Sequence, residues 1–307
     1  YFGGVLFSVV YNMTAGILNA AGNSRRSLVY LAWASVTNIV LDLVFIVGLR
    51  MGVAGAAIAT DLSQLVSCVL SLRFLMKSED ACRVELSAIR LHRKMASRII
   101  RVGLPTGIQN MVISFSNVLV QASVNSYGAA AMAGFAAYMK IDGFNILPVS
   151  SISMAATTFV GQNMGAKQTK RAKKGVNVAL LLSISCIVLL MIPVLYFAPL
   201  IISFLIPDKA VVETGTMFLR TLTPFYVLFA FNQIYACALR GRGNSVAPMI
   251  IMLSSFVGFR QLYLFFMSQI CNEIIPIAMA YPAGWLLCSL LTGICYHIST
   301  REKKEKA

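Results

Sequence analysis

Three carboxylates lie inside long apolar runs of the sequence. Of the eleven Asp and Glu residues, eight fall between these runs or in the C-terminal tail, and the other three are Asp42, Asp61 and Asp142. A carboxylate in the hydrocarbon region of a bilayer costs at least about 2.5 kcal/mol. Each of the three is therefore a candidate functional residue that faces the interior of a helical bundle.

Asp42 has the clearest chemical setting of the three. Asn38 stands four residues earlier, so that an amide and a carboxylate share one helical face, and Ser35 continues that face. Such a cluster of hard oxygen ligands can hold Na⁺, or the carboxyl group can titrate because burial raises its pKa. The alternative is that Asp42 only forms a hydrogen bond within the bundle.

Asp61 lies beside a different polar stripe. Thr60, Gln64, Ser67 and Ser71 follow one another at spacings of four, three and four residues. Asp61 is rotated by about 100° from this stripe. We therefore expect Thr60 to face a cavity, and Asp61 to lie near the outer end of its helix.

A third polar face follows Pro105. It consists of amide and hydroxyl side chains spaced three or four residues apart on an otherwise apolar helix: Asn110, Ser114, Asn117, Gln121 and Asn125. These groups either line a substrate cavity or form hydrogen bonds between helices, at about 0.6 kcal/mol each.

Asp142 lies two residues after Lys140, so the two side chains cannot meet on a regular helix. Asp142 is expected either to attract a cationic substrate or to pair with a basic residue such as Arg260. Arg260 stands in the middle of another apolar run and needs a partner or water there.

The composition identifies the elements that position these groups. The 307 residues are 58% hydrophobic and 12% charged, with a net charge of +15 and a mean hydropathy of +0.77. A soluble protein has about 25% charged residues, so this is an integral membrane protein. The positive charges cluster between apolar runs, which indicates membrane topology rather than nucleic-acid binding.

Catalysis and cofactor binding are not indicated. No HExxH motif and no CxxC pair occur in the sequence, no paired acids stand within an apolar run, and neither histidine stands in the middle of one. We therefore expect neither an enzyme nor a membrane-embedded variant of one, no cofactor, and no metal beyond Na⁺ at Asp42. The seven cysteines form no disulfide framework.

The apolar runs are long enough for helices that cross a bilayer and too long for barrel strands. Nine spans are predicted, at residues 1–21, 27–49, 52–76, 103–125, 130–160, 176–206, 214–239, 246–270 and 274–298. Alternate connections and the tail hold 20 of the 26 Lys and Arg residues. The excess of positive charge predicts that Ala307 is cytoplasmic and Tyr1 is outside.

An internal repeat divides the spans. Leu18-Asn-Ala-Ala-Gly-Asn-Ser24 and Leu239-Arg-Gly-Arg-Gly-Asn-Ser245 agree at four of seven positions, and each closes one predicted span. The repeat unit is six spans, in parallel orientation. Residues 1–77 are predicted to form the C-terminal half of a first lobe, with three spans. A cytoplasmic linker (78–101), a second lobe of six spans (102–298) and a basic tail (299–307) follow. A full protein would then have twelve spans, and we expect the nine alone to be inactive.

The sequence resembles the multidrug and toxic compound extrusion (MATE) transporters. The most specific match is Gly161-Gln-Asn-Met-Gly-Ala166, and further matches span nearly the whole chain. They are Gly22-Asn23-Ser24, residues 38–42, residues 52–60, Gly103-Leu-Pro-Thr-Gly107, Lys140-Ile-Asp142, Arg171 and residues 239–245. The resemblance implies an all-α fold of two six-helix lobes around a central cavity.

The resemblance also implies an activity and a site. MATE transporters export organic cations or drugs in exchange for Na⁺ or H⁺, by alternating access. Asn38, Asp42 and Thr60 match a first-lobe cation site of some members, whose acidic partner belongs to a span before this sequence. Some members also carry an acid on the helix after Gly103, and here that helix has none.

The expected partners are small organic cations and the lipid bilayer, and we expect a monomeric multi-pass protein of the plasma membrane. The runner-up is a flippase for a lipid-linked precursor or polysaccharide, which would use Lys140 and Arg260 to hold a pyrophosphate. A passive channel is a third alternative, and the two-lobe repeat favours a transporter over it.

Overall fold

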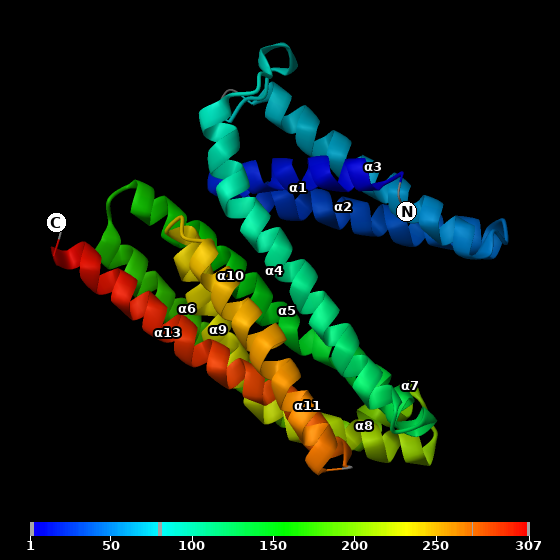
Figure 1. Ribbon diagram of the computed structural model, residues 1–307. Helices are drawn as coiled ribbons and strands as arrows, with labels where there is room; N and C mark the ends of the chain where they lie inside the picture. The colour runs from blue at the N-terminus through cyan, green and yellow to red at the C-terminus, as the bar shows by residue number, and fades with distance from the viewer. Residues whose placement is uncertain (1–2, 79–81, 272, 306–307) are drawn as a thin grey trace. The chain divides into compact units, whose positions relative to one another are not determined.

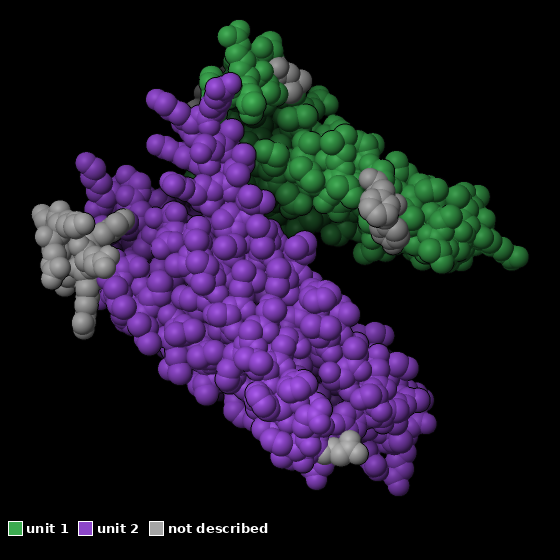
Figure 2. Space-filling model, in the orientation of Figure 1, with its two compact units in different colours: residues 1–92 green, residues 93–307 purple. Residues whose placement is uncertain are grey.

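The computed structural model describes residues 3–78, 82–271 and 273–305. The described residues form helices and no strand (Figure 1). They separate into two compact units, residues 1–92 and 93–307, which Figure 2 colours separately. The protein is an all-α polytopic membrane protein, as predicted.

The first unit contains three long helices. They are α1 (Val5–Ala20), α2 (Ser24–Asp42), continued by a π-helical segment η1 (Leu43–Gly48), and α3 (Gly52–Lys77). A short turn, η2 (Leu86–Ala88), follows. The hydroxyl of Tyr11 on α1 donates to Ser27 O on α2 at 3.1 Å, and Thr14 Oγ1 lies 2.8 Å from Ser71 Oγ on α3. Hydrogen bonds between small polar groups thus join the three helices.

The second unit holds the remaining helices and the main hydrophobic core. They are α4 (Arg93–Asn125), α5 (Ala129–Gly165), α6 (Thr169–Tyr196), α7 (Ala198–Leu205), α8 (Lys209–Leu222), η3 (Thr223–Phe225), α9 (Tyr226–Gly241), α10 (Val246–Leu253), η4 (Ser254–Phe259), α11 (Arg260–Ile270), α12 (Ile274–Ala278) and α13 (Ala280–Glu305). The helix α5 packs against α6, α8 and α9, so it is central to this unit.

Glycine allows the closest of these helix contacts. A Cβ atom on Gly134 of α5 would lie 2.9 Å from Gly215 N of α8, and one on Gly241 of α9 would lie 2.8 Å from Thr157 O of α5. Small residues let helix backbones approach each other inside a membrane, where the hydrophobic effect does not hold helices together.

The spans differ from the prediction in their details. Seven helical segments of the described residues are long and apolar enough to cross a membrane, whereas nine were predicted. Of the other two, α1 has only 16 residues, and α4 is long but carries many polar side chains. The predicted span 176–206 is interrupted at Phe197, two residues before Pro199. The predicted span 214–239 lies in one helical segment, which changes to a short 3₁₀ turn at η3, where Pro224 stands.

Helix boundaries also moved outward. The helix α4 begins at Arg93, inside the predicted linker, and α13 continues to Glu305, inside the predicted tail. Lys and Arg are good helix formers, so a charged segment can extend a helix beyond its apolar part. The orientation of the chain in the membrane stays a prediction.

Candidate functional site: a polar cavity in the second unit

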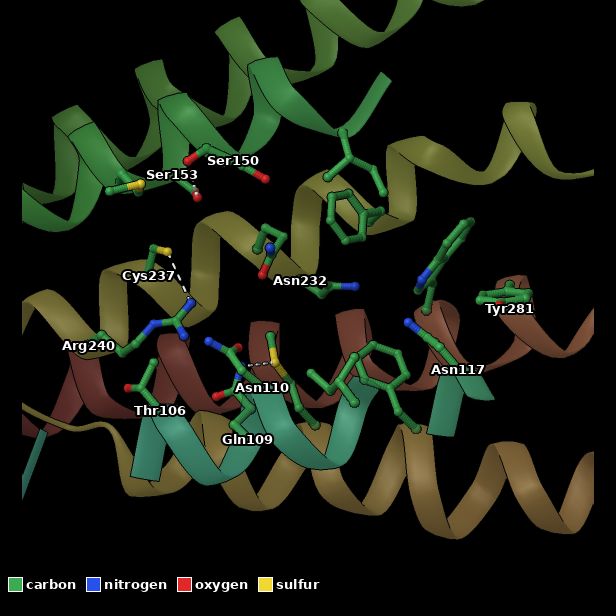
Figure 3. A pocket seen from close by; sticks show the side chains of 18 of the residues that line it. Thr106, Gln109, Asn110, Asn117, Ser150, Ser153, Asn232, Cys237, Arg240 and Tyr281 are labelled. Atoms are coloured by element: carbon green, nitrogen blue, oxygen red, sulfur yellow. Dashed lines mark hydrogen bonds between the residues drawn. The ribbon is translucent and has the colours of Figure 1, made fainter. Parts of the chain in front are cut away.

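A cavity of about 660 Å³ lies among the helices of the second unit. Side chains of α4, α5, α9, α10, η4, α11 and α13 line it. In Figure 3, Thr106, Cys237 and Arg240 lie at one end of the cavity, and Asn117 and Tyr281 lie at the other. A cavity of this volume is in the range of sites that hold small organic molecules.

Asp142 is the acidic group of this cavity. Its side chain is buried, and the hydroxyl of Tyr138 donates a hydrogen bond to its Oδ1 at 3.2 Å. The hydroxyl of Tyr226 on α9 donates to the same oxygen, and the two tyrosine oxygens lie 3.3 Å apart. Hydroxyl donors stabilise a buried carboxylate. Tyr138 is one helical turn before Asp142, so the spacing of four residues brings the two side chains together.

Arg260 is a buried basic group at the same cavity, and its hydrogen-bond partners are neutral. Its guanidinium donates from Nε to Ser116 Oγ at 3.2 Å, from Nη2 to the same oxygen, and from Nη2 to Asn117 Oδ1 at 3.0 Å. Gln261 Nε2 also donates to Ser116 Oγ, at 2.8 Å. No ion pair joins Arg260 to Asp142 in the part of the chain that the structure describes. Of the two expected roles of Asp142, pairing with Arg260 is therefore not the one seen.

The polar face of α4 is turned slightly from the predicted one. Asn110 and Asn117 line the cavity, together with Thr106, Gln109 and Ile113. The predicted residues Ser114 and Gln121 are not among the lining residues: Ser114 is exposed, and Gln121 Nε2 instead donates to Asn125 Oδ1 at 2.8 Å. The face that lines the cavity includes Thr106 and Ile113. Gln109 donates to Met252 of α10 and Ser116 accepts from Arg260 of α11, and these contacts fix the rotation of α4.

Several buried polar atoms of this cavity make no hydrogen bond to a described residue. They are the amide oxygen of Gln109, the amide nitrogen of Asn232 and the hydroxyl of Tyr281. A buried polar group without a partner costs about 1 to 3 kcal/mol. These atoms are therefore available to water or to a ligand inside the cavity.

The predicted cation site lies in the first unit. Asp42 Oδ1 and Asn38 Nδ2 are buried, and neither atom makes a hydrogen bond to a described residue. Thr60 Oγ1 instead donates to Ala56 O, one turn back on its own helix, at 2.9 Å. Asp42 stands at the C-terminus of α2, directly before the π-helical segment η1. π-helical segments are often found at functional sites.

The other polar side chains of α3 have structural surroundings. Ser71 meets Thr14 of α1, and Ser67 Oγ donates to Gln64 O at 2.9 Å. Asp61 lies against the start of α1, where a Cβ atom on Gly4 would collide with its carboxylate. The described residues contain no group of three His, Cys, Asp or Glu side chains that could hold a metal ion.

The comparison with protein families decides the classification. The MatE family model matches residues 105–265, which is more than half of the chain. The chain belongs to the MatE family. The family resemblance of the sequence is thereby confirmed.

Relatives and solved structures agree with this assignment. The chain is 30% identical over 256 residues to the probable multidrug resistance protein YpnP of Bacillus subtilis, covering 83% of this chain and 57% of that protein. It is 28% identical over 295 residues to the FAD transporter of Shewanella oneidensis, covering 92% and 63%. The chain thus spans less than two thirds of the length of either relative.

The fold is likewise that of solved transporters. A MOP superfamily transporter from Pyrococcus furiosus matches with a TM-score of 0.93 and 21% identity, over 98% of this chain and 68% of that one. In this MatE family member, Asp142 and Arg260 line the cavity of the second unit, and Asn38 and Asp42 lie in the first unit.

Sequence reasoning missed Gln109, Ser116 and Asn232. All three are buried: Gln109 and Ser116 have their partners on other helices, as Ser116 shows with Arg260, 144 positions away, and the amide nitrogen of Asn232 has no partner among the described residues. Spacing along one helix carries no information on such a partner. Gln109 alone had a usable signal, because it neighbours Asn110 on the predicted polar helix.

Proposed function

We propose that this chain forms part of a secondary antiporter that exports small amphipathic organic compounds, organic cations among them, in exchange for Na⁺ or H⁺. The observation that carries the proposal is the 660 Å³ cavity of a MatE family member, lined by the buried carboxylate of Asp142 and by aromatic rings. Trp285 and Phe229 stand 5.9 Å apart at its wall, where a flat organic compound can stack.

Coupling is assigned to Asp42 and Asn38 rather than to the cavity. Their buried oxygen and nitrogen lack partners among the described residues, and Na⁺ or a proton would supply the missing partner of the carboxylate. Thr60 completes the proposed site. In the proposed cycle, ion binding at Asp42 and substrate binding near Asp142, Asn110 and Asn117 favour different conformations, so that ion entry drives substrate exit.

The setting follows from the same proposal. The antiporter is placed in the plasma membrane as a monomer, with a cytoplasmic C-terminus, in contact with the lipid bilayer. The flippase alternative is not favoured, because relatives such as YpnP are named as multidrug resistance proteins, and Lys140, one of the two bases assigned to it, is exposed and does not line the cavity.

Dye efflux tests the proposed function. Cells that express the gene from its natural start are loaded with the cation rhodamine 123, and a Na⁺ gradient, a H⁺ gradient or neither is imposed. We expect efflux with one gradient only, and its loss by a factor of ten or more in Asp42→Asn. Asp61→Asn is the matched control, since this acid of α3 lies against Gly4 rather than at the proposed site and the variant should keep efflux.

Two results would contradict the proposal. The first is efflux by Asp42→Asn equal to that of the parent protein at equal membrane abundance, which would remove Asp42 from coupling. The second is no efflux under any gradient, which would remove the export of organic cations.

A further inference from the structure

Arg260 is a buried cation without a counter-ion among the described residues. Its side chain is 2% exposed, yet its hydrogen bonds go only to Ser116 and Asn117, which carry no charge. Nη1 makes no hydrogen bond to any described residue. A buried charge is stable only when it is paired and hydrogen-bonded. Two donor hydrogens of the guanidinium are therefore unused at the edge of the cavity.

The surroundings of Arg260 are shaped for a flat ligand. The guanidinium carbon lies 5.0 Å from the ring centre of Tyr281 and 5.6 Å from that of Phe256. Trp285 lies 6.0 Å from Tyr281, centre to centre, and continues the aromatic wall. Arg260, Tyr281, Phe256 and Trp285 all line the cavity, and the hydroxyl of Tyr281 has no partner among the described residues. A donor and a stacking surface thus stand next to the guanidinium.

The charges of the cavity wall do not balance. Asp142 is the acidic lining residue, whereas Arg240 and Arg260 are both basic. Asp142 already accepts hydrogen bonds from Tyr138 and Tyr226, and it forms no ion pair with Arg260 within the described ranges. Arg240 stands at the opposite end of the cavity from Tyr281 (Figure 3), where it donates to Cys237 Sγ at 3.2 Å. At the end near Tyr281, the positive charge of Arg260 is therefore not compensated by an ion pair among the described residues.

We propose that Arg260 forms an anion subsite, which binds the carboxylate of a flat aromatic substrate. Nη1, whose two hydrogens are unused by the described residues, can donate charge-assisted hydrogen bonds to a carboxylate, and the aromatic wall holds the ring system of the substrate. This inference deepens the proposed function and rests on it: it adds aromatic carboxylates and zwitterions to the compounds that the cavity takes.

A matched pair of dyes tests the subsite. Rhodamine 110 carries a free carboxylate, and rhodamine 123 is its methyl ester, so the two differ only in the proposed anchor. The protein has two tryptophans, and Trp285 lines the cavity. In a Trp33→Phe background, quenching of Trp285 fluorescence in nanodiscs measures the dissociation constant of each dye. We expect rhodamine 110 to bind at least ten-fold more tightly than rhodamine 123.

Two variants identify Arg260 as the cause. Arg260→Gln should lower the affinity for rhodamine 110 at least ten-fold and leave that for rhodamine 123 within two-fold. Asn117→Asp keeps the arginine and places a carboxylate where Asn117 Oδ1 now accepts a bond of 3.0 Å. It should weaken rhodamine 110 binding by a similar factor and raise the melting temperature. Arg220→Gln, at an exposed arginine of α8 outside the cavity lining, is the matched control and should change the ratio of the two affinities less than two-fold.

The outcomes separate this inference from the proposed function. Equal binding of the two dyes, or equal losses for both dyes in Arg260→Gln and Asn117→Asp, would overturn the anion subsite but leave an export cavity for cations. Absence of binding for either dye in the parent protein would count against the proposed function itself.

Discussion

Two spans of this protein, Ser24–Gly48 and Val246–Ile270, follow turns of the same kind but contain charged residues of opposite sign. In the first unit, α1 ends before Gly22, which has φ +84°, and Asn23 N donates to Leu18 O at 2.8 Å. In the second unit, α9 ends before Gly243, also with φ +84°, and Asn244 N donates to Leu239 O at 3.0 Å. This hydrogen bond over five residues, with glycine in the left-handed region, closes a helix by the Schellman motif.

Both spans also contain a π-helical segment with a charged residue at its edge. In the first unit Asp42 directly precedes η1, and in the second unit Arg260 directly follows η4. The partners differ. Arg260 donates to Ser116 and Asn117 of α4, whereas Asp42 Oδ1 has no hydrogen-bond partner among the described residues.

Burial explains the difference. In the most apolar part of Ser24–Gly48, 6% of the residues are buried, against 28% for Val246–Ile270. In the second unit, α4 and α13 pack on this span and supply partners, whereas in the first unit the neighbours are α1 and α3. The repeated sequence therefore specifies the turn, and the neighbouring helices specify the chemistry of the site.

The largest expected effect concerns packing. Gly134→Val should destabilise the second unit by about 3 kcal/mol, because its Cβ would lie 2.9 Å from the backbone nitrogen of Gly215. Gly16→Val in the first unit is the matched control, with nothing within 4 Å of the new Cβ. Each unit has one tryptophan, Trp33 or Trp285, so thermal unfolding of single-tryptophan variants follows each unit separately. If the two variants lowered the melting temperatures of their own units by the same amount, the proposed difference in packing would be refuted.

A smaller effect is expected for the two acids. Asp142→Asn weakens the hydrogen bonds from Tyr138 and Tyr226 by removing the charge of their acceptor, and should cost about 2 kcal/mol. Asp42→Asn should leave the melting temperature unchanged or raise it, because a neutral amide is easier to bury without a partner than a carboxylate. The measurement is thermal unfolding in detergent without Na⁺.

The reverse result would change the comparison. If Asp42→Asn lowered the melting temperature as much as Asp142→Asn does, Asp42 would be held by protein partners, and its proposed role in ion coupling would lose its support. Addition of Na⁺ is the control, because Na⁺ should stabilise the parent protein and not Asp42→Asn if the ion binds there.

The sequence was sufficient for the fold class and for much of the helix pattern. Long apolar runs predict membrane helices regardless of their neighbours, and the motif around Gly22 recurs around Gly243 as the same turn. The interruption at Phe197 and the 3₁₀ turn at Thr223–Phe225 were missed. The prolines near them, Pro199 and Pro224, were visible in the sequence, but a proline inside an apolar run can also be accommodated in a continuous helix, as Pro148 is in α5.

The candidate site was less accessible to prediction. Spacing placed Asn110 and Asn117 on one face, and both line the cavity, as does Asp142. Ser114 satisfies the same spacing but is exposed, since the rotation of α4 depends on α10 and α11, which are distant in sequence. The sequence indicated that Arg260 needs a partner but not which one, because Ser116 and Asn117 lie on another helix, α4. Periodicity along one helix determines a face, and only tertiary packing determines what the face meets.

The smallest expected effect concerns the shared turn. Gly22→Ala and Gly243→Ala should each destabilise their own unit by about 1 kcal/mol, because an L-residue is strained at φ +84°. No atom lies within 4 Å of the new Cβ at either site, so the two effects should be equal despite the difference in burial. The melting temperatures of the single-tryptophan variants provide the measurement.

The turn after α5 supplies a control of opposite sign. Lys167 occupies the left-handed position there with φ +59°, and Gln168 N donates to Asn163 O at 2.8 Å, as in the other two turns. Lys167→Gly should therefore stabilise the second unit, by slightly less than about 1 kcal/mol, since glycine adopts this conformation without strain. A loss of stability in Lys167→Gly, or an effect of Gly243→Ala several times that of Gly22→Ala, would show that tertiary packing rather than backbone conformation sets the cost of these turns.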